Sequence, residues 1–540
     1  MALMKSSAIK QAVRNVAKWG DTDVFPFPIE NHVLHDKGAE MQRLIGSMSS
    51  SKEFDNYINT EPVSFHSTLA PVGYTGFRWA TQIDPLWNTY LLALTLELAP
   101  SIEGARVPRD ANSVFSYRYS GEQEDSLFDP AGWRSFQAET RLRADKHKYV
   151  ISVDIADFYS RIYHHRLENA LRKIDGAGTV TRQIMSILSK LSTNTSYGLP
   201  VGGPAARIMS ELALNRVDLL LSRNPLTSNF CRYADDYRFF VDDIPSAYRC
   251  IGFLAEKLQR NDGLALQKSK TRIMTSSEYL STLDPADPKD GSAAKFLGLH
   301  IHYDPYSATA AEDYDRLKEK LSEFDVVSLL RAELKKGRIH IALTRRLAAA
   351  LQHMDQTTRE QAIKSLMENV DKLAPVFPQV MLSIRRALDS AEDEGFVERV
   401  HASIRELIET SHYVANIELN LAFMVRVLSG RQSIENEQLL IGLYNAAHGF
   451  EAAPSPAIRR DIMLTMARWG ADYWLSDRKN YVSSEHPWVR RAFIISSYVL
   501  GDEGKHWRSA NKASMRPFEE IVRDWAAEKR QAPGEWNIPV

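Results

Sequence analysis

The chain has 540 residues, more than one ordinary hydrophobic core holds, so two or more domains are expected. Hydrophobic residues at 44% and charged residues at 25% are typical of a soluble globular protein. The 67 basic and 68 acidic residues give a net charge of −1, which argues against a protein that only coats nucleic acid. This balance suits an enzyme whose basic contacts lie in a channel and are offset elsewhere.

Export and membrane insertion are not indicated by the sequence. Cys231 and Cys250 alone cannot form a disulfide framework or a four-ligand zinc site. The amphipathic N-terminus lacks the continuous apolar core of a signal peptide, and no apolar run approaches the length of a membrane span. We therefore expect a cytoplasmic protein with reduced cysteines and no membrane partner.

The first part of the chain alternates between strand-like and helical patterns. Strands are predicted at residues 150–155, at 295–302 and as a pair within 229–242. Helices are predicted at residues 85–99, 161–173, 204–222 and 245–261, and Asp84 is a plausible N-cap for the first of them. Such a mixture predicts an α+β layer domain.

After about residue 310 the pattern is helical almost to the end. Apolar residues recur at helical spacing in residues 317–334, 342–351, 361–373, 400–408, 417–428, 439–447, 458–474, 489–500 and 517–527. Short helices separated by turns favour an all-α array of HEAT-like repeats. The sequence has no strict repeat period, so a non-repeating bundle remains an alternative.

Two adjacent carboxylates, Asp235 and Asp236, stand between two apolar strands in residues 230–240 (FCRYADDYRFF). Two neighbouring charges at a buried turn are costly unless a cation neutralises them, and Mg²⁺ does so with carboxylates and substrate phosphates. The alternative is a solvated hairpin tip.

A third carboxylate, Asp154, ends the apolar strand at residues 150–155 and precedes a helix. There it can face a neighbouring hairpin tip, and Asp154 and Asp235 would then bridge two metal ions roughly 4 Å apart, as in-line phosphoryl transfer requires. Asp157 competes with Asp154 for this role, although its place in the first helical turn also suits capping. The catalytic and metal-binding residues are thus predicted to be Asp154, Asp235 and Asp236.

These two blocks, in this order, resemble motifs A and C of reverse transcriptases. Residues 198–204 (GLPVGGP) resemble motif B, a Gly-rich turn that includes Gly202 and lies beneath the incoming nucleotide. Residues 266–271 (LQKSKT) resemble motif D, whose Lys270 would approach the triphosphate, and residues 295–299 (KFLGL) resemble motif E. Residues 106–119 occupy the place of the fingers, where a basic residue such as Arg118 would bind substrate.

The resemblance covers residues 80–302 and implies a right-hand fingers-palm domain at 1–302, with an all-α domain at 303–540 in place of a thumb. In the family, a ring at the position of Tyr159 excludes a 2′-hydroxyl and so selects dNTPs. The alternative for Tyr159 is an aromatic core residue. Val201 stands where the family usually has glutamine, which either weakens templating or is a packing substitution.

The chain also resembles bacterial abortive-infection and defence-associated reverse transcriptases. This resemblance lies in residues 17–23 (AKWGDTD), in residues 157–165 (DFYSRIYHH) and in the helical C-terminal half. The resemblance implies a Mg-dependent DNA polymerase in phage defence, with RNA or single-stranded DNA as partner. Templated, untemplated and protein-primed synthesis all remain open. A retron-like enzyme and a catalytically silent helical scaffold are the alternatives, and homo-oligomerisation is left open. The basic residues between 331 and 346 line either a nucleic-acid path or a solvated helix face.

Overall fold

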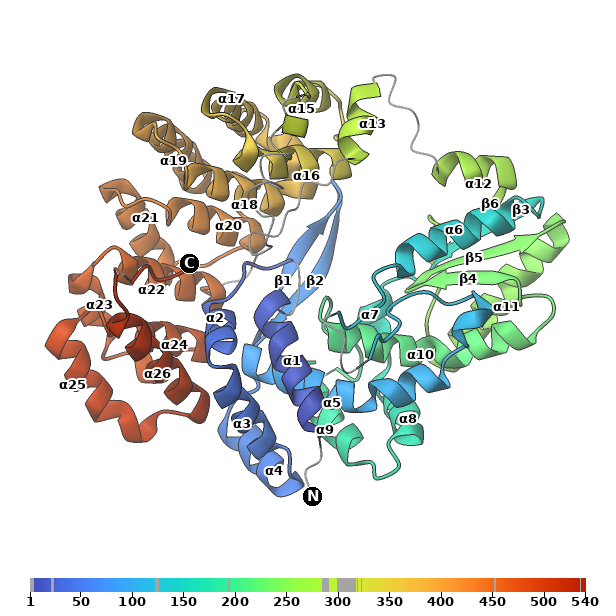
Figure 1. Cartoon of the computed structure of the whole chain (residues 1–540), viewed down its shortest axis with the longest axis horizontal. Coiled ribbons are helices and arrows are strands. Elements are labelled where there is room, and N and C mark those ends of the chain that lie inside the picture. The colour runs from blue at the N-terminus through green and yellow to red at the C-terminus, as the bar shows by residue number, and fades with distance from the viewer. Residues whose placement is uncertain are drawn as a thin grey trace.

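The computed structural model describes residues 4–20, 24–121, 126–192, 195–283, 291–298, 317, 319–321, 323–450, 453–534 and 536–540. A mixed α/β block lies on one side of the molecule and a curved array of helices on the other (Figure 1). The N-terminal helices and a long β-hairpin lie between them. The predicted α+β class of the first part and the helical character of the second are confirmed.

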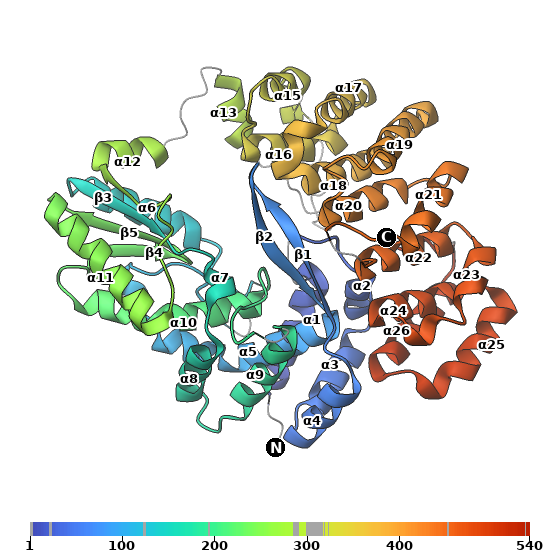
Figure 2. The ribbon, with the colours of Figure 1, turned by 180° about the vertical axis from the view of Figure 1, so that it is seen from behind.

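The sheet of the mixed block has four antiparallel strands in the order β4-β5-β3-β6. Their bounds are β3 Tyr149–Asp154, β4 Phe230–Tyr233, β5 Asp236–Val241 and β6 Arg272–Thr275. Because successive side chains point to opposite faces, Val150 and Phe240 pack with Phe136 of helix α6 on one face, while Val153 and Phe239 belong to the core on the other. Figure 2 shows helix α11 across that second face. The sheet is therefore covered on both sides.

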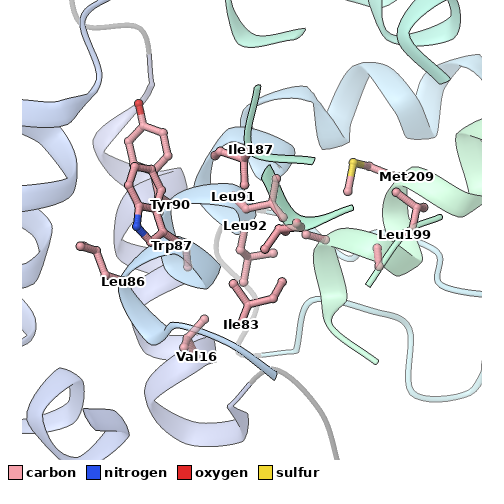
Figure 3. Packing of buried hydrophobic residues seen from close by; sticks show 14 of the residues in the cluster. Val16, Ile83, Leu86, Trp87, Tyr90, Leu91, Leu92, Ile187, Leu199 and Met209 are labelled. Atoms are coloured by element: carbon pink, nitrogen blue, oxygen red, sulfur yellow. The ribbon is translucent and has the colours of Figure 1, made fainter. Parts of the chain in front are cut away.

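The helices of the mixed block and the N-terminal region include one long buried helix, α5, against which α1, α8, α9 and α10 pack. Their bounds are α1 Ser6–Trp19, α2 Ile29–Asp36, α3 Gly38–Met48, α4 Ser51–Thr60, α5 Pro85–Ala105, α6 Gly132–Ala144, α7 Phe158–Arg161, α8 His164–Ile174, α9 Thr179–Leu191, α10 Pro204–Arg223, α11 Ile244–Asp262, α12 Ser276–Leu283 and α13 Gly291–Gly298. Asp84 caps α5 by accepting a hydrogen bond from the backbone N–H of Leu86 at 3.0 Å, as predicted. The core runs from α1 and α5 to α9, and on to Leu199 and Met209 at α10 (Figure 3).

A two-stranded hairpin, β1 Phe65–Val72 and β2 Gly76–Ile83, reaches from this core to the helical array (Figure 2). Near its tip, the Tyr74 hydroxyl accepts a hydrogen bond from the Ile339 N–H at 2.7 Å and donates to the Lys372 carbonyl at 3.3 Å. His66 of β1 bonds to Glu418. The hairpin, which was not among the predicted elements, thus ties the mixed block to the array.

The array consists of helices in two layers. Their bounds are α15 Val326–Leu334, α16 Ile341–Ala350, α17 Gln356–Met367, α18 Phe377–Leu388, α19 Glu394–Glu409, α20 Glu418–Leu428, α21 Ile434–Asn445, α22 Pro456–Arg468, α23 Asp472–Arg478, α24 Pro487–Ser496, α25 Gly501–Asn511 and α26 Pro517–Gln531. Helices α15, α17, α19 and α21 pack one against the next, and α16, α18, α20, α22, α24 and α26 do the same (Figure 1). Such stacking of alternate helices gives a two-layered, curved arrangement.

The far end of the array is fused to the N-terminal region through buried charges. Arg491 of α24 donates to Glu30 at 3.0 Å and to Asp84 at 2.5 Å, and all three side chains are almost fully buried. The indole N–H of Trp488 also donates to Asp84, at 2.9 Å. The residues predicted to form two domains therefore share a core, and removing the array would leave the buried carboxylates of Glu30 and Asp84 without the cation of Arg491.

One predicted strand is wrong. Within residues 295–302, the described residues 295–298 lie in helix α13, and residues 299–302 lie outside the described residues. A short apolar run does not distinguish a strand from a buried helical segment, and Phe296 is buried here against Phe324. In the described part of the chain, no helix has the length and apolar character to span a bilayer.

Candidate active site

Asp154 and Asp236 face each other across the two central strands. Asp154 is the last residue of β3, Asp236 is the first of β5, and the two are paired in register. Asp235 lies in the turn before β5, and its carbonyl oxygen accepts a hydrogen bond from the Ile155 N–H at 3.2 Å. The end of one strand and the tip of the neighbouring hairpin therefore place the three predicted residues at the same end of the sheet.

The turn that carries Asp235 has an unusual backbone conformation. Ala234 has φ 52°, in the left-handed region that a residue with a Cβ seldom adopts without support. The Arg232 guanidinium supplies that support, because Nη1 donates a hydrogen bond to the Ala234 carbonyl oxygen at 2.8 Å. Arg232 is fully buried and reaches this carbonyl from the preceding strand, β4.

Beneath the turn, Arg232 also forms two buried ion pairs with helix α10. Its Nη2 lies 2.7 Å from Glu211 Oε2 and 2.6 Å from Asp218 Oδ2. Burial alone would raise the pKa of Glu211, but Arg232 and Arg106 hold it below its usual value. Removing one partner of such a network leaves an uncompensated buried charge, so this network fixes where the hairpin tip lies. Sequence reasoning missed it, although an arginine inside an apolar strand was a signal.

Electrostatics within the site distinguish the carboxylates. Burial, and then the adjacent charge of Asp154, raises the pKa of Asp235 to about 6. Asp154 accepts a hydrogen bond from Lys270 Nζ at 2.9 Å, which raises the pKa of that lysine. Asp236 is more exposed, and its carboxylate contacts Arg238 at 3.4 Å. The charges of Asp154 and Asp235 therefore interact directly, while Asp236 lies at the exposed edge of the site.

The carboxylates at this site are the possible ligands of a divalent cation. Among the residues that the structure describes, no group of three or more His, Cys, Asp or Glu side chains converges on one metal position. Mg²⁺ needs fewer, because it is commonly held by one or two carboxylates together with waters and substrate phosphates. Asp154 and Asp235 can supply those carboxylates, since Asp154 is buried, Asp235 is partly buried and the charge of Asp154 acts on Asp235. The residues present fit Mg²⁺ bound together with a nucleotide.

Lys270 and the segment before it are attached to the catalytic strand. The Gln267 N–H donates to the Asp154 carbonyl oxygen at 2.8 Å, and the Ala156 N–H donates to the Ala265 carbonyl oxygen at 2.9 Å. Asp157, the competitor of Asp154, has an exposed side chain and φ 49°, and no side-chain hydrogen bond caps α7. Lys270 thus reaches the carboxylates, and Asp157 lies outside the cluster.

Tyr159 lies beside the loop that resembles motif B. Its carbonyl oxygen accepts from the Leu199 N–H at 2.9 Å, its hydroxyl lies near those of Tyr117 and Ser210, and burial raises its pKa well above the usual value. In that loop Gly202 has φ 121°, which favours glycine, and the next residue is the N-cap of α10. The half-buried Val201 lies with Thr81 and Ile83 around a small gap, as a packing residue would.

The expectation that Arg118 binds substrate does not fit the structure. Arg118 is only 4% exposed, and its guanidinium donates to the carbonyls of Val114 and Val107 and to Glu103. Burial lowers its pKa to about 10. Its donors are used in holding the fingers loop, so it cannot reach a triphosphate without breaking these bonds.

Arg207 is the basic residue that sequence reasoning missed. It lies one turn into α10 with its guanidinium carbon 5.3 Å from the ring centroid of Tyr117, and its charge acts on Tyr117 and Tyr159. No ion pair holds Arg207 among the described residues. The signal was its position four residues after the glycine pair at 202–203.

His164, the first residue of α8, is buried. Its Nε2 lies 2.6 Å from the carbonyl oxygen of Gly198, and the Gly198 N–H donates to the Ile162 carbonyl oxygen at 2.9 Å. Gly198 has φ 98°. His164 therefore helps hold the loop that carries Gly202.

The basic residues between 331 and 346 lie on α15, α16 and the turn between them, and most are exposed. Arg338 lies over the ring of Tyr74 at the hairpin tip, at 5.7 Å from its centroid. These positive charges thus gather where the array meets the hairpin.

A comparison with known protein families agrees with this site. Residues 102–301 match the family model described as reverse transcriptase (RNA-dependent DNA polymerase), a segment that contains Asp154, Asp235, Asp236 and Lys270. No curated protein sequence matches the chain. A similar solved structure is the telomerase from Candida albicans in complex with a TWJ fragment of telomeric RNA. It has 9% identity and a TM-score of 0.29, over 72% of this chain and 68% of that one. By the family-model match over residues 102–301, the chain carries a reverse-transcriptase domain and is an RNA-directed DNA polymerase by that domain.

Proposed function

We propose that the chain adds dNTPs to a growing DNA strand with two Mg²⁺ ions held at Asp154, Asp235 and Asp236. The adjacency of Asp154 and Asp235, with Lys270 Nζ 2.9 Å from Asp154, is the observation that carries the proposal. Bound Mg²⁺ supplies positive charge that favours ionisation of a 3′-hydroxyl and stabilises a leaving pyrophosphate. The carboxylates position the reacting groups and balance that charge.

In this mechanism Lys270 has two binding partners, first Asp154 and then the triphosphate. It forms an ion pair with Asp154, and its side chain is 63% exposed. When the carboxylate is neutralised otherwise, the same ammonium group is released toward the anionic triphosphate. Its pKa is raised in the structure, so it is charged at neutral pH and can also give a proton to the leaving group.

The nucleotide would lie between motif B and the fingers. Gly202 lets the backbone approach the base, Arg207 offers a cation for phosphate oxygens, and the Tyr159 ring blocks a 2′-hydroxyl. The fixed position of Tyr159 beside Tyr117 and Ser210 supports such exclusion, because a steric barrier works only when its group cannot move aside.

The helical half would guide nucleic acid. We assign residues 1–302 to a fingers-palm domain and residues 303–540 to a HEAT-like array that takes the place of a thumb. The two-layered stacking supports this assignment, and the exposed basic residues of α15 and α16 supply phosphate contacts for RNA or single-stranded DNA.

A role in phage defence rests on the resemblance to abortive-infection reverse transcriptases, as do untemplated and protein-primed synthesis. Plating phage on cells that carry the wild-type gene or its Asp235→Asn variant tests the defence role. Protection by the wild type alone is expected, and equal plaque counts on both strains would contradict it.

Product analysis tests the mode of synthesis. Purified protein is incubated with Mg²⁺ and labelled dNTPs, with and without added RNA, and the products are sequenced and run on a denaturing gel before and after protease. Copies of the added RNA support templated synthesis, whereas a defined product without RNA supports untemplated synthesis. Label that stays with the protein until protease treatment supports a tyrosine hydroxyl as the primer. No product under any condition would contradict polymerase activity.

A further inference from the structure

A second pocket lies in the mixed block, apart from the catalytic carboxylates. Its volume is about 670 Å³, and it is bounded by α8, α10 and the end of α11. Apolar side chains such as Leu167, Leu212 and Leu219 line its interior, and none of the three catalytic aspartates is among the lining residues. This volume is within the usual range for small-molecule sites.

Four basic residues surround this pocket. They are Arg166 and Lys173 of α8, and Arg216 and Arg223 of α10. All four are exposed, and none makes an ion pair or a side-chain hydrogen bond within the described part of the chain. Arg172, on the same helix but outside the pocket, is by contrast paired with Glu168 at 2.6 Å. The charges around the pocket are thus uncompensated, apart from one carboxylate at its base.

That carboxylate is Asp262, the last residue of α11. Its Oδ2 is buried and has no hydrogen-bond donor among the described residues. Burial raises the pKa of Asp262 to about 6, against the opposing charges of Arg166 and Arg216. A buried acceptor without a donor is costly, so this oxygen is suited to an N–H or O–H group of a ligand.

An aromatic pair borders the same pocket. Tyr163 is one of the lining residues, and its ring stacks on that of Tyr197 with centroids 4.9 Å apart and planes 30° apart. Tyr197 is itself 51% exposed. The pair offers a flat apolar surface of the kind on which a nucleobase packs.

We propose that this pocket binds a nucleoside phosphate at a site separate from the polymerase centre. The four basic residues bind the phosphates, and the leucine-lined interior with Tyr163 takes the base. Asp262 accepts a hydrogen bond from the amino group of the base or from a ribose hydroxyl. An inorganic anion would use only the rim, and an apolar compound would leave four charges unpaired, so a ligand with both parts fits best.

The site adjoins the loop that resembles motif B. Ile162 and Tyr163 line the pocket, and the Ile162 carbonyl oxygen accepts the hydrogen bond from Gly198. His164, the next residue, lies 2.6 Å from the Gly198 carbonyl oxygen. A ligand against Tyr163 therefore contacts the same segment that holds Gly198 in place.

Equilibrium dialysis of the full-length chain with labelled ATP, GTP, CTP and UTP, each in EDTA, tests the proposal. Without a divalent cation the catalytic carboxylates repel a triphosphate, so binding there is suppressed. We expect one of the four to bind at one site per chain, with the same affinity in Asp235→Asn. Arg166→Ala and Arg216→Ala should each weaken binding by about tenfold or more, since each removes a charge-assisted hydrogen bond. Arg172→Ala is the matched control and should not change it.

Folding of each variant is checked by its urea unfolding midpoint, which should not move because these arginines are exposed. Four outcomes would overturn the proposal: no binding by the folded chain, binding that survives Arg166→Ala and Arg216→Ala together, equal affinity for inorganic triphosphate, and binding of RNA oligonucleotides alone. Because Asp235→Asn retains the pocket, loss of polymerase activity and loss of this binding are distinguishable.

Discussion

Arg232 donates a hydrogen bond from Nη1 to the carbonyl oxygen of Ala234 at 2.8 Å, and so fixes the turn that carries Asp235. The same guanidinium is neutralised from below by Glu211 and Asp218. The buried ion network therefore connects α10 to the strained backbone at Ala234. Through this connection, α10 determines the location of the catalytic hairpin.

Arg232→Leu should strongly destabilise the protein, because Asp218 would remain buried without its ion-pair partner and Glu211 would keep only Arg106. We expect a loss of about 3–5 kcal/mol in the free energy of unfolding, measured by urea denaturation. Arg232→Lys keeps the charge but loses the forked geometry. It should unfold at a higher urea concentration than Arg232→Leu yet incorporate dNTPs about tenfold or more slowly than wild type, because Ala234 loses its support. A wild-type unfolding midpoint for Arg232→Leu would contradict this account.

Tyr159→Val should raise ribonucleotide use relative to deoxynucleotide use. The shorter side chain leaves room for a 2′-hydroxyl and removes the clash that discriminates between the sugars. The measurement is the ratio of kcat/KM for a dNTP to that for the matching rNTP. We expect the ratio to fall by about tenfold or more. Tyr248→Val, on the exposed face of α11, is the control. If the ratio is the same in both variants, Tyr159 has a packing role and does not select the sugar.

Residues 1–302 expressed alone should be insoluble or inactive. Without α24 and its Arg491, the buried Glu30 and Asp84 lose their partner, and Asp84 also loses Trp488. Activity and solubility are compared with those of the full chain. Processive synthesis by this fragment would show that the array serves another purpose, such as assembly.

Stability should depend on pH through Glu61, which is buried where α4 ends. Burial, and then the charge of Asp84, raises its pKa from 4.5 to about 7. The folded protein thus holds this proton more tightly than the unfolded chain, so its contribution to stability is lost as pH rises from 4.5 to about 7.

Glu61→Gln removes that dependence. Relative to wild type, the variant should gain about 1–3 kcal/mol in unfolding free energy between pH 5 and pH 8. Urea titrations at the two pH values measure the gain. A difference between variant and wild type that is the same at both pH values would rule this out.

The sequence was sufficient to predict the central strands and the carboxylates at their ends. Apolar strands that end in Asp154 and flank Asp235 leave few arrangements other than adjacent strands, because both runs must be buried in one sheet. The structure places Asp154 in register with Asp236. Local pattern and tertiary pairing agree here, so the prediction of these strands succeeded.

Other predictions failed where long-range pairing decides the outcome. Arg118 and Arg207 are both basic residues near glycine-rich or turn segments. Only the fold reveals that Arg118 pairs with Glu103, while Arg207 has no ion-pair partner among the described residues. Residues 295–298 form a helix because Phe296 is buried against Phe324 at the start of the array, which no local pattern indicates.

The most direct test of the polymerase mechanism is the rate of single-nucleotide incorporation by Asp235→Asn in Mg²⁺, with Asp157→Asn as matched control. Asparagine keeps the volume of Asp235 and removes a buried charge whose pKa is raised to about 6, so the fold should remain stable. We expect incorporation to fall by about two orders of magnitude or more, while Asp157→Asn retains it. Near-normal incorporation by folded Asp235→Asn would contradict the mechanism.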